Sequence, residues 1–136
     1  MNQVLTADFI KYMAGEVVRH HEDLYIAIGS GDGNWDNDGL PDVDPAVDSL
    51  LSEEARLPVS KVEFVDSNNE VSAAPTSKIS IVSSRFSAEE YEGPVRECGL
   101  FYGTGEDSVL ILYSVFPRIM ITPQIALTKS LSIDFT

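Results

Sequence analysis

The chain contains a single cysteine, Cys98, among its 136 residues. One thiol cannot form an internal disulfide, and it cannot supply a metal site built from several cysteines. The sequence also lacks any apolar run of the ~18–20 residues needed to cross a bilayer. Its first residues have neither a basic start nor a continuous apolar segment, so we expect no secretion signal and synthesis in a cytoplasm. Stability must therefore come from a packed core.

Basic residues are scarce as well. The 9 Lys and Arg face 22 Asp and Glu, which gives a formal net charge of −13. Such a surface repels phosphate, so we expect neither nucleic acid nor an anionic membrane as a partner. The acidic residues are unevenly placed, since ten lie between Glu22 and Ala55 without one Lys or Arg among them. A run of this kind is typical of a solvated surface.

The hydrophobic content of 43% and the length predict one domain over residues 1–136. Thr6 suits the N-cap of a helix, and Phe9, Met13 and Val17 repeat at four-residue steps. We therefore expect an N-terminal helix over 6–20. A β domain is expected to follow over 24–136.

The β domain is predicted from short apolar or alternating segments with turn residues between them. Val109–Phe116 is apolar on both faces, which favours a central strand that ends at Pro117. In the last segment, 125–135, large apolar residues alternate with small or polar ones, and only Lys129 interrupts the apolar face. The fold class expected is mainly β, an antiparallel β-sandwich or small barrel with an N-terminal helix and a long acidic loop. We expect a short helix within 46–55 and strands over 24–28, 57–65, 78–86, 95–102, 109–116 and 125–135.

A glycine cluster, Gly29-Ser30-Gly31-Asp32-Gly33, follows the first predicted strand. The pattern is similar to a dinucleotide-binding turn, which needs a helix N-terminus directly after the glycines. Residues 34–41 are not expected to begin such a helix, and their aspartates would repel phosphate. We therefore exclude phosphate binding here.

The residues after the glycines suggest a calcium site instead. Oxygen-bearing side chains and a glycine have the spacing of the first ligands of an EF-hand-like loop. Pro45 stands where that loop would need its bidentate acid, and a polar turn explains the same residues. The candidate ligands are Asn34, Asp36, Asp38 and Asp42.

Two charged neighbours, Arg96 and Glu97, lie within a predicted strand. Adjacent strand residues face opposite sides of a sheet, so they are not expected to pair with each other. We expect partly buried structural ion pairs of Arg96 with Glu53 or Glu54, and of Glu97 with Arg56.

We find no catalytic constellation in the sequence. Cys98 lies in mid-strand with both histidines far away in the chain, so we expect a small buried hydrophobe. A nucleophile elbow is absent, and one tryptophan gives little support for a sugar-cleaving cleft. The sequence therefore predicts a protein that is not an enzyme and has no cofactor, apart from the calcium alternative.

Three blocks, taken in order, resemble a known family. They are 25–33, which runs from Tyr25 to Gly33, then 50–59, which contains Ser52-Glu53-Glu54-Ala55-Arg56, and then 93–101, which contains Arg96-Glu97-Cys98-Gly99-Leu100-Phe101. With the strands that follow, they resemble the N-terminal attachment domain of bacteriophage tail-collar fibre proteins. Small tail or baseplate proteins built on that domain are similar too. The resemblance extends over residues 24–136.

The resemblance implies a structural protein of the virion tail, assembled in the host cytoplasm. Such domains attach fibres to a tail or baseplate and are oligomeric. The expected partners are further copies of this chain, as a trimer or ring, and other tail, baseplate or fibre proteins. Because the sequence ends at Thr136, directly after the last strand, we expect no shaft and no receptor-binding tip. We therefore expect an adaptor, a baseplate decoration or the root of a fibre, in a phage or a contractile injection system.

Assembly contacts are expected on the N-terminal helix, with Phe9 and Tyr12, and on the acidic loop around Trp35. A lone Trp in a polar loop suits an interface anchor, although it could equally fold back on its own domain. The final alternating strand could pair with a neighbour by edge addition. The alternative function is a calcium-binding or carbohydrate-binding β module on a particle surface.

Overall fold

The computed structural model describes residues 3–103 and 105–136. Within these ranges helix α1 (Ala7–Arg19) and a short 3-10 turn, η1 (His21–Asp23), precede the first strand. The loops carry a one-turn helix, α2 (Trp35–Asp38), and a second 3-10 turn, η2 (Gly105–Asp107). The strands are β1 (Leu24–Gly29), β2 (Glu53–Val65), β3 (Lys78–Ser83), β4 (Gly93–Tyr102), β5 (Val109–Ile121) and β6 (Ser130–Asp134).

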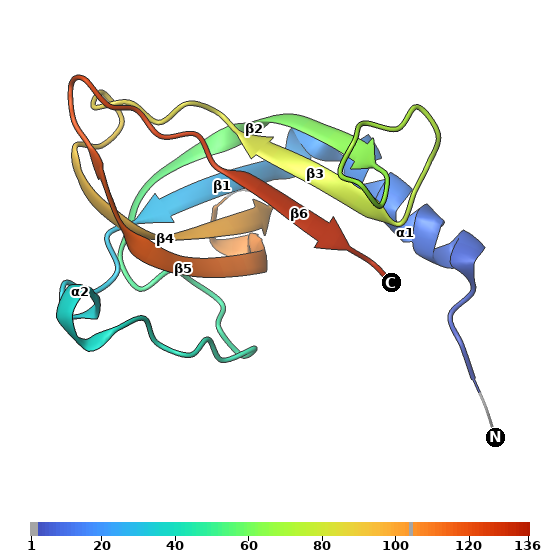
Figure 1. Cartoon of the computed structure of the whole chain (residues 1–136), viewed down its shortest axis with the longest axis horizontal. Coiled ribbons are helices and arrows are strands. Elements are labelled where there is room, and N and C mark those ends of the chain that lie inside the picture. Colours follow the sequence, from blue (N-terminus) through green and yellow to red (C-terminus); the bar gives the residue numbers. More distant parts are fainter. Residues whose placement is uncertain (1–2, 104) are drawn as a thin grey trace.

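These six strands of the described chain form one antiparallel sheet in the order β5-β4-β1-β2-β3-β6. The sheet curls into a half-barrel, and α1 lies at the end of the molecule that is opposite to α2 (Figure 1). The mainly β fold with an N-terminal helix and a long acidic loop is therefore confirmed. It is built from one curled sheet instead of two packed sheets. None of the helices described has the length and hydropathy to cross a membrane.

Helix α1 begins where the sequence predicts, because the Thr6 hydroxyl accepts a hydrogen bond from the backbone N–H of Phe9 at 3.3 Å. The predicted series Phe9, Met13 and Val17 is only partly buried, because Val17 packs on the core and Phe9 lies on the surface. Ala14 is fully buried, and Val17 packs beside it against the core. Phe9 and Tyr12 are 48% and 61% exposed. Their rings stack with centroids 6.2 Å apart, which leaves an aromatic pair on the surface.

The curled sheet has apolar residues on both faces. A large core cluster includes Ile26 and Ile28 of β1, which point to one side. Ala27 points to the other side and joins a smaller cluster with Leu50 and Phe101. Strand β4 is buried continuously over 95–101, as expected for a strand in the middle of a sheet.

The predicted central position of Val109–Phe116 is wrong, because β5 is an edge strand. Its two apolar faces have another explanation. Leu110 packs on the small cluster and Leu112 on the large one, so both faces of the sheet are covered at this edge. The strand also continues through Pro117, which lies in an irregular stretch opposite the register shift after Val95. Proline is tolerated there because an edge strand needs fewer ladder hydrogen bonds.

Several predicted boundaries change as well. Strand β2 begins at Glu53 and pairs antiparallel with β1. The helix expected within 46–55 is not formed, because the chain before Glu53 is irregular and residues 53–55 already belong to this strand. Strand β3 ends at Ser83. Phe86 and Leu127 then pair through an isolated bridge, so only the last part of the alternating C-terminal segment becomes β6.

Cys98 is fully buried, as predicted. Burial raises the pKa of its thiol to about 11. At pH 8 the thiolate is therefore rare, and the sulfur is shielded from reagents. We expect the native protein to react with an aromatic disulfide reagent at least ~100-fold more slowly than the same protein in concentrated guanidinium. Rapid reaction of the native protein would show that β4 is accessible and would contradict its central position.

Candidate functional site

The candidate site is the acidic loop, residues 30–52, which carries six aspartates. Strands β1 and β2 pair antiparallel, so the two ends of the loop emerge side by side. A hydrogen bond of 3.0 Å from the N–H of Ser30 to the carbonyl of Ser52 closes its base. The body of the loop, with α2, extends from this end of the sheet (Figure 1).

A buried carboxylate holds the base of the loop. Glu97 of β4 is fully buried. It accepts hydrogen bonds from the backbone N–H groups of Gly31 at 3.1 Å, and of Leu51 and Ser52 at 2.8 Å each. The Tyr113 hydroxyl of β5 donates a fourth bond at 2.6 Å. Burial, and then this hydrogen bond, raises the pKa of Tyr113 and keeps it a donor. One side chain thus joins both ends of the loop to two strands.

The glycines after β1 make this arrangement possible. A Cβ at Gly29 would collide with the Glu97 carboxylate and the Ser52 carbonyl. Gly31 has φ of 61°, and a Cβ there would collide with the ring of Trp35. The glycines therefore leave room for the protein's own carboxylate, and one backbone N–H of the cluster, that of Gly31, binds it.

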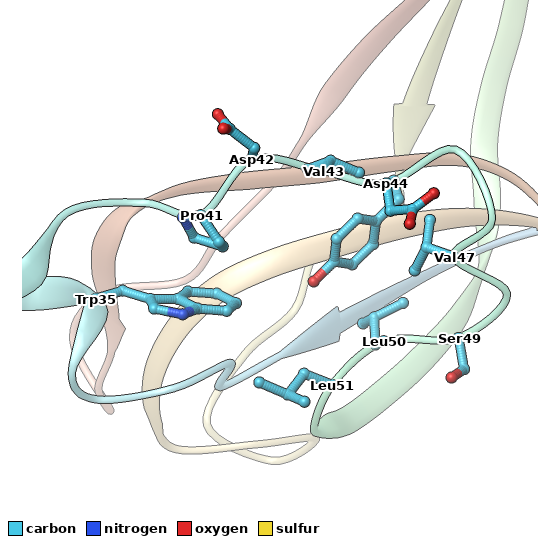
Figure 2. A pocket seen from close by; sticks show the side chains of 10 residues that line it. Trp35, Pro41, Asp42, Val43, Asp44, Val47, Ser49, Leu50 and Leu51 are labelled. Atoms are coloured by element: carbon cyan, nitrogen blue, oxygen red, sulfur yellow. The ribbon is translucent and has the colours of Figure 1, made fainter.

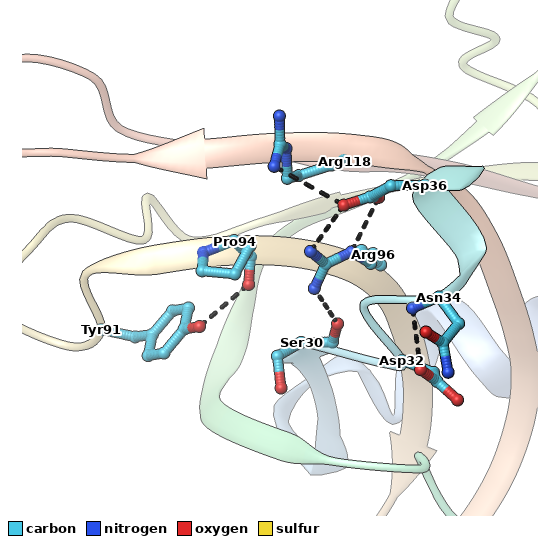
Figure 3. Close-up of polar contacts among 8 residues, drawn as sticks. All are labelled: Ser30, Asp32, Asn34, Asp36, Tyr91, Pro94, Arg96 and Arg118. Atoms are coloured by element: carbon cyan, nitrogen blue, oxygen red, sulfur yellow. Dashed lines mark hydrogen bonds and ion pairs between the residues drawn. The ribbon is translucent and has the colours of Figure 1, made fainter.

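Arg96, the neighbour of Glu97, fixes the outer part of the loop. It is 7% exposed and forms a bidentate pair with Asp36 of α2, with Nε–Oδ1 and Nη2–Oδ2 distances of 2.9 and 2.8 Å. Its Nη1 donates to the carbonyl of Ser30 at 2.8 Å. Arg118 of β5 lies 3.5 Å from the same carboxylate (Figure 3). These contacts hold α2 against β4.

The partners predicted for Arg96 and Glu97 are wrong. Arg56, the expected partner of Glu97, pairs at 2.7 Å with Glu53 of its own strand. Arg96 pairs with Asp36, and Glu97 binds uncharged donors. The physical reason is that the loop folds back over the end of β4, which places α2 beside a residue 60 positions away in the sequence.

The predicted calcium ligands are not brought together. Residues 35–38 form a helical turn, so side chains two positions apart point in different directions. Both oxygens of Asp36 are bound to Arg96. In the part of the chain that the structure describes, Asp36, Asp38 and Asp42 belong to no group of three side chains that could hold a metal. The helical turn itself also differs from the expectation that residues 34–41 would not begin a helix.

The loop and β5 border a pocket of about 400 Å³. Trp35 and Pro41 lie at one end of it, and Val47 lies at the other (Figure 2). Leu50 and Leu51 form the side opposite the 41–44 segment (Figure 2). Trp35 therefore folds back on its own loop, which is one of the two alternatives that its sequence left open, and it also borders the pocket. Its role as an interface anchor stays a prediction.

Comparison of the chain with models of protein families and with curated proteins finds no match. Sequence reasoning missed Tyr113 as a partner of Glu97, and it missed the role of Asp36 in a structural ion pair. The two adjacent charged residues within a predicted strand, Arg96 and Glu97, were the one sequence feature that indicated buried polar partners of this kind.

Replacing Glu97 with Gln should loosen the base of the loop. The carboxamide nitrogen would face a buried N–H donor and leave it without an acceptor. We expect Glu97→Gln to lower the free energy of unfolding by roughly 2–4 kcal/mol in urea titrations followed by circular dichroism. The matched control Glu70→Gln, in the exposed turn after β2, should change it by less than about 0.5 kcal/mol. Equal stability of the two variants would contradict the proposed role of the carboxylate.

The pair between Arg96 and Asp36 should give stability that depends on pH. The hydrogen bonds from Arg96 lower the pKa of Asp36 below its ordinary value of 3.8. The stabilisation is therefore fully present above the pKa of the unfolded chain, and it is lost as the pH falls through the lowered pKa of the folded protein. We expect wild type to exceed Asp36→Asn in unfolding free energy at pH 7, with the difference shrinking below about pH 4.

The control for this measurement is Asp38→Asn, which removes the same charge from the same helical turn. Asp38 has no ion pair within the described residues. The free energy of unfolding of Asp38→Asn should differ little from that of wild type at every pH. A difference for Asp36→Asn that is constant from pH 7 down to about pH 2 would show that the carboxylate is not held by Arg96.

Proposed function

We propose that this chain is a structural assembly protein, an adaptor or fibre-attachment component of a phage-like tail or baseplate. The observation that carries the proposal is that the three sequence blocks of the resemblance meet at one carboxylate. Block 25–33 supplies the N–H of Gly31, block 50–59 supplies those of Leu51 and Ser52, and block 93–101 supplies Glu97. The blocks are therefore parts of one structural unit, which is what a shared attachment domain requires and which supports the proposal.

The use of the buried polar groups supports a structural role over a catalytic one. Arg96 and Glu97 are buried, and their hydrogen bonds reach the loop, α2 and the hydroxyl of Tyr113. Groups engaged in this way fix a backbone geometry. They are not poised for proton transfer to a substrate. The result is a stiff sheet that presents a positioned loop.

Exposed apolar surface supports oligomer formation. Val4 and Leu5, in the segment before α1, are 88% and 64% exposed. The stacked pair Phe9 and Tyr12 follows on the helix itself. This segment extends away from the sheet (Figure 1). Strands β5 and β6 have open edges whose backbone groups can pair with another chain. A homo-oligomer, a trimer or a ring, together with tail, baseplate or fibre proteins as partners, would cover these surfaces.

Carbohydrate binding is the second candidate, because Trp35 and Tyr113 both line the pocket beside the loop. Aromatic side chains with nearby polar groups are common in ligand pockets. A glycan array decides this alternative. Specific hits that Trp35→Ala abolishes would favour a carbohydrate-binding module, and an empty array removes it.

Sedimentation velocity over a range of concentrations tests the oligomer. We expect wild type to sediment as a trimer or a larger ring. The double variant Phe9→Ser/Tyr12→Ser should shift toward monomer, because it removes the exposed aromatic pair without touching the core. The control Val71→Ser changes an apolar side chain that is 65% exposed on the loop after β2, and it should leave the oligomer unchanged. A wild-type protein that remains monomeric at every concentration would contradict the oligomer.

The place of the protein is tested separately by gold-labelled antibodies on tail particles purified from the source of the chain. We expect label at one defined position on the tail or baseplate. Particles that are labelled by an antibody to the tail tube, and not by the antibody to this chain, would refute the tail assignment.

A further inference from the structure

The pocket beside the acidic loop has the size and lining of a site for one long side chain. Its volume of about 400 Å³ lies near the lower end of the range for ligand pockets, roughly 300–1,000 Å³. The walls are apolar and include two aromatic residues, Trp35 and Tyr113, with Val47 and Leu50 between loop and sheet. A helix or a whole hairpin of a partner would not enter a space of this size.

The negative charge around the pocket favours a cationic side chain as its ligand. Asp42 and Asp44 line it, and no Lys or Arg occurs from Glu22 to Ala55. One oxygen of Asp44 accepts the N–H of Ala46 at 2.8 Å, which leaves the other oxygen to a ligand. A cationic side chain with a long apolar stem fits both the walls and the acidic border.

The cations near the pocket are already engaged. Arg96 and Arg118 are paired with Asp36, and Arg56 is paired with Glu53. The negative charge at Asp42 and Asp44 is therefore not neutralised by these arginines. With a net charge of −13 the whole chain attracts a basic partner over long range. The same charge disfavours a second copy of this chain as the occupant.

Apolar surface continues outward from the pocket. Val43 and Leu51 are 42% and 63% exposed on the loop, and Val109 and Ile111 are 60% and 39% exposed on the neighbouring edge strand β5. A second hollow, lined by Val43 and Ile111 among others, continues along that edge. An extended peptide segment could therefore lie along β5 while one of its side chains enters the pocket.

We infer that the pocket holds an arginine side chain from an extended basic segment of a partner protein. The guanidinium stacks on the indole of Trp35, the aliphatic stem packs on Leu50, and the carboxylates of Asp42 and Asp44 attract the cation from the border of the pocket. Arginine suits the site better than lysine because a planar cation stacks on an aromatic face. The inference rests on the proposed assembly role only in requiring a protein partner, and it does not depend on the kind of particle.

The experiment uses fluorescein-labelled, acetylated pentapeptides with a central Arg between two valines and two serines, and matched peptides with Lys, Gln or Glu at the centre. Fluorescence anisotropy with the full chain should rank affinity as Arg, then Lys, then Gln and Glu. Quenching of Trp35, the one tryptophan in the sequence, should follow the same titration. Binding should weaken as salt rises from about 50 to about 200 mM.

Variants locate the site. Trp35→Ala and Asp42→Asn/Asp44→Asn should each raise the Kd for the Arg peptide by about 10-fold or more. Trp35→Phe should restore part of the loss, because it keeps an aromatic face. The control Glu70→Gln/Glu89→Gln removes the same charge from exposed acids elsewhere and should leave the Kd within about 2-fold. Unchanged thermal melting of the variants shows that the fold is intact.

Two results with the peptides would overturn the inference. Equal binding of the Arg and Gln peptides would mean that the pocket does not recognise the positive charge of the side chain. Equal weakening by Asp42→Asn/Asp44→Asn and by the control pair would mean that only overall charge attracts the peptide. Either result would leave the sedimentation and antibody tests of the assembly role standing, so the two failures are distinguishable. Binding of a glycan at Trp35 with no binding of the Arg peptide would also refute it.

Discussion

The structure depends on the buried carboxylate of Glu97, whose hydrogen bonds in the described part of the chain come from uncharged donors. Removing a charge from water is costly unless hydrogen bonds replace its hydration, and Glu97 receives three backbone N–H groups and one hydroxyl. Those donors come from both ends of the acidic loop and from β5. The charge therefore specifies where the loop leaves the sheet and where it returns. An apolar residue at position 97 would leave these buried donors without acceptors.

The residue beside it, Arg96, directs the rest of the loop. Its bidentate pair with Asp36 brings α2 onto the end of the sheet, and this fixes Trp35 next to Gly31. Two adjacent residues of one strand thus position the base and the outer turn of the same loop. The pocket beside β5 exists because both are held. Turns within the loop are closed by its own aspartates, and β4 fixes where the loop lies on the sheet.

The same arrangement explains which surfaces remain for partners. Strands β4 and β1 pair with a neighbour on each side, so their backbone groups are not open to another chain. Apolar clusters cover both faces of the sheet near the loop. The edges β5 and β6, the aromatic pair of Phe9 and Tyr12, and the border of the pocket stay open. A stiff body with several separate open surfaces is well suited to joining other chains, and this underlies the assembly role that we propose.

The sequence alone determined the local structure: the cap at Thr6, the helix after it, the series of antiparallel strands and the burial of Cys98. These follow from periodicity and capping, which act over a few residues. Only the tertiary structure decided that β5 is an edge and that Glu97 and Arg96 hold the loop. A period of two says which side chains share a face but not which strand lies beside them. The partner of a buried charge likewise depends on which distant segments of the chain meet in the fold, and the residues around the charge in the sequence do not show this.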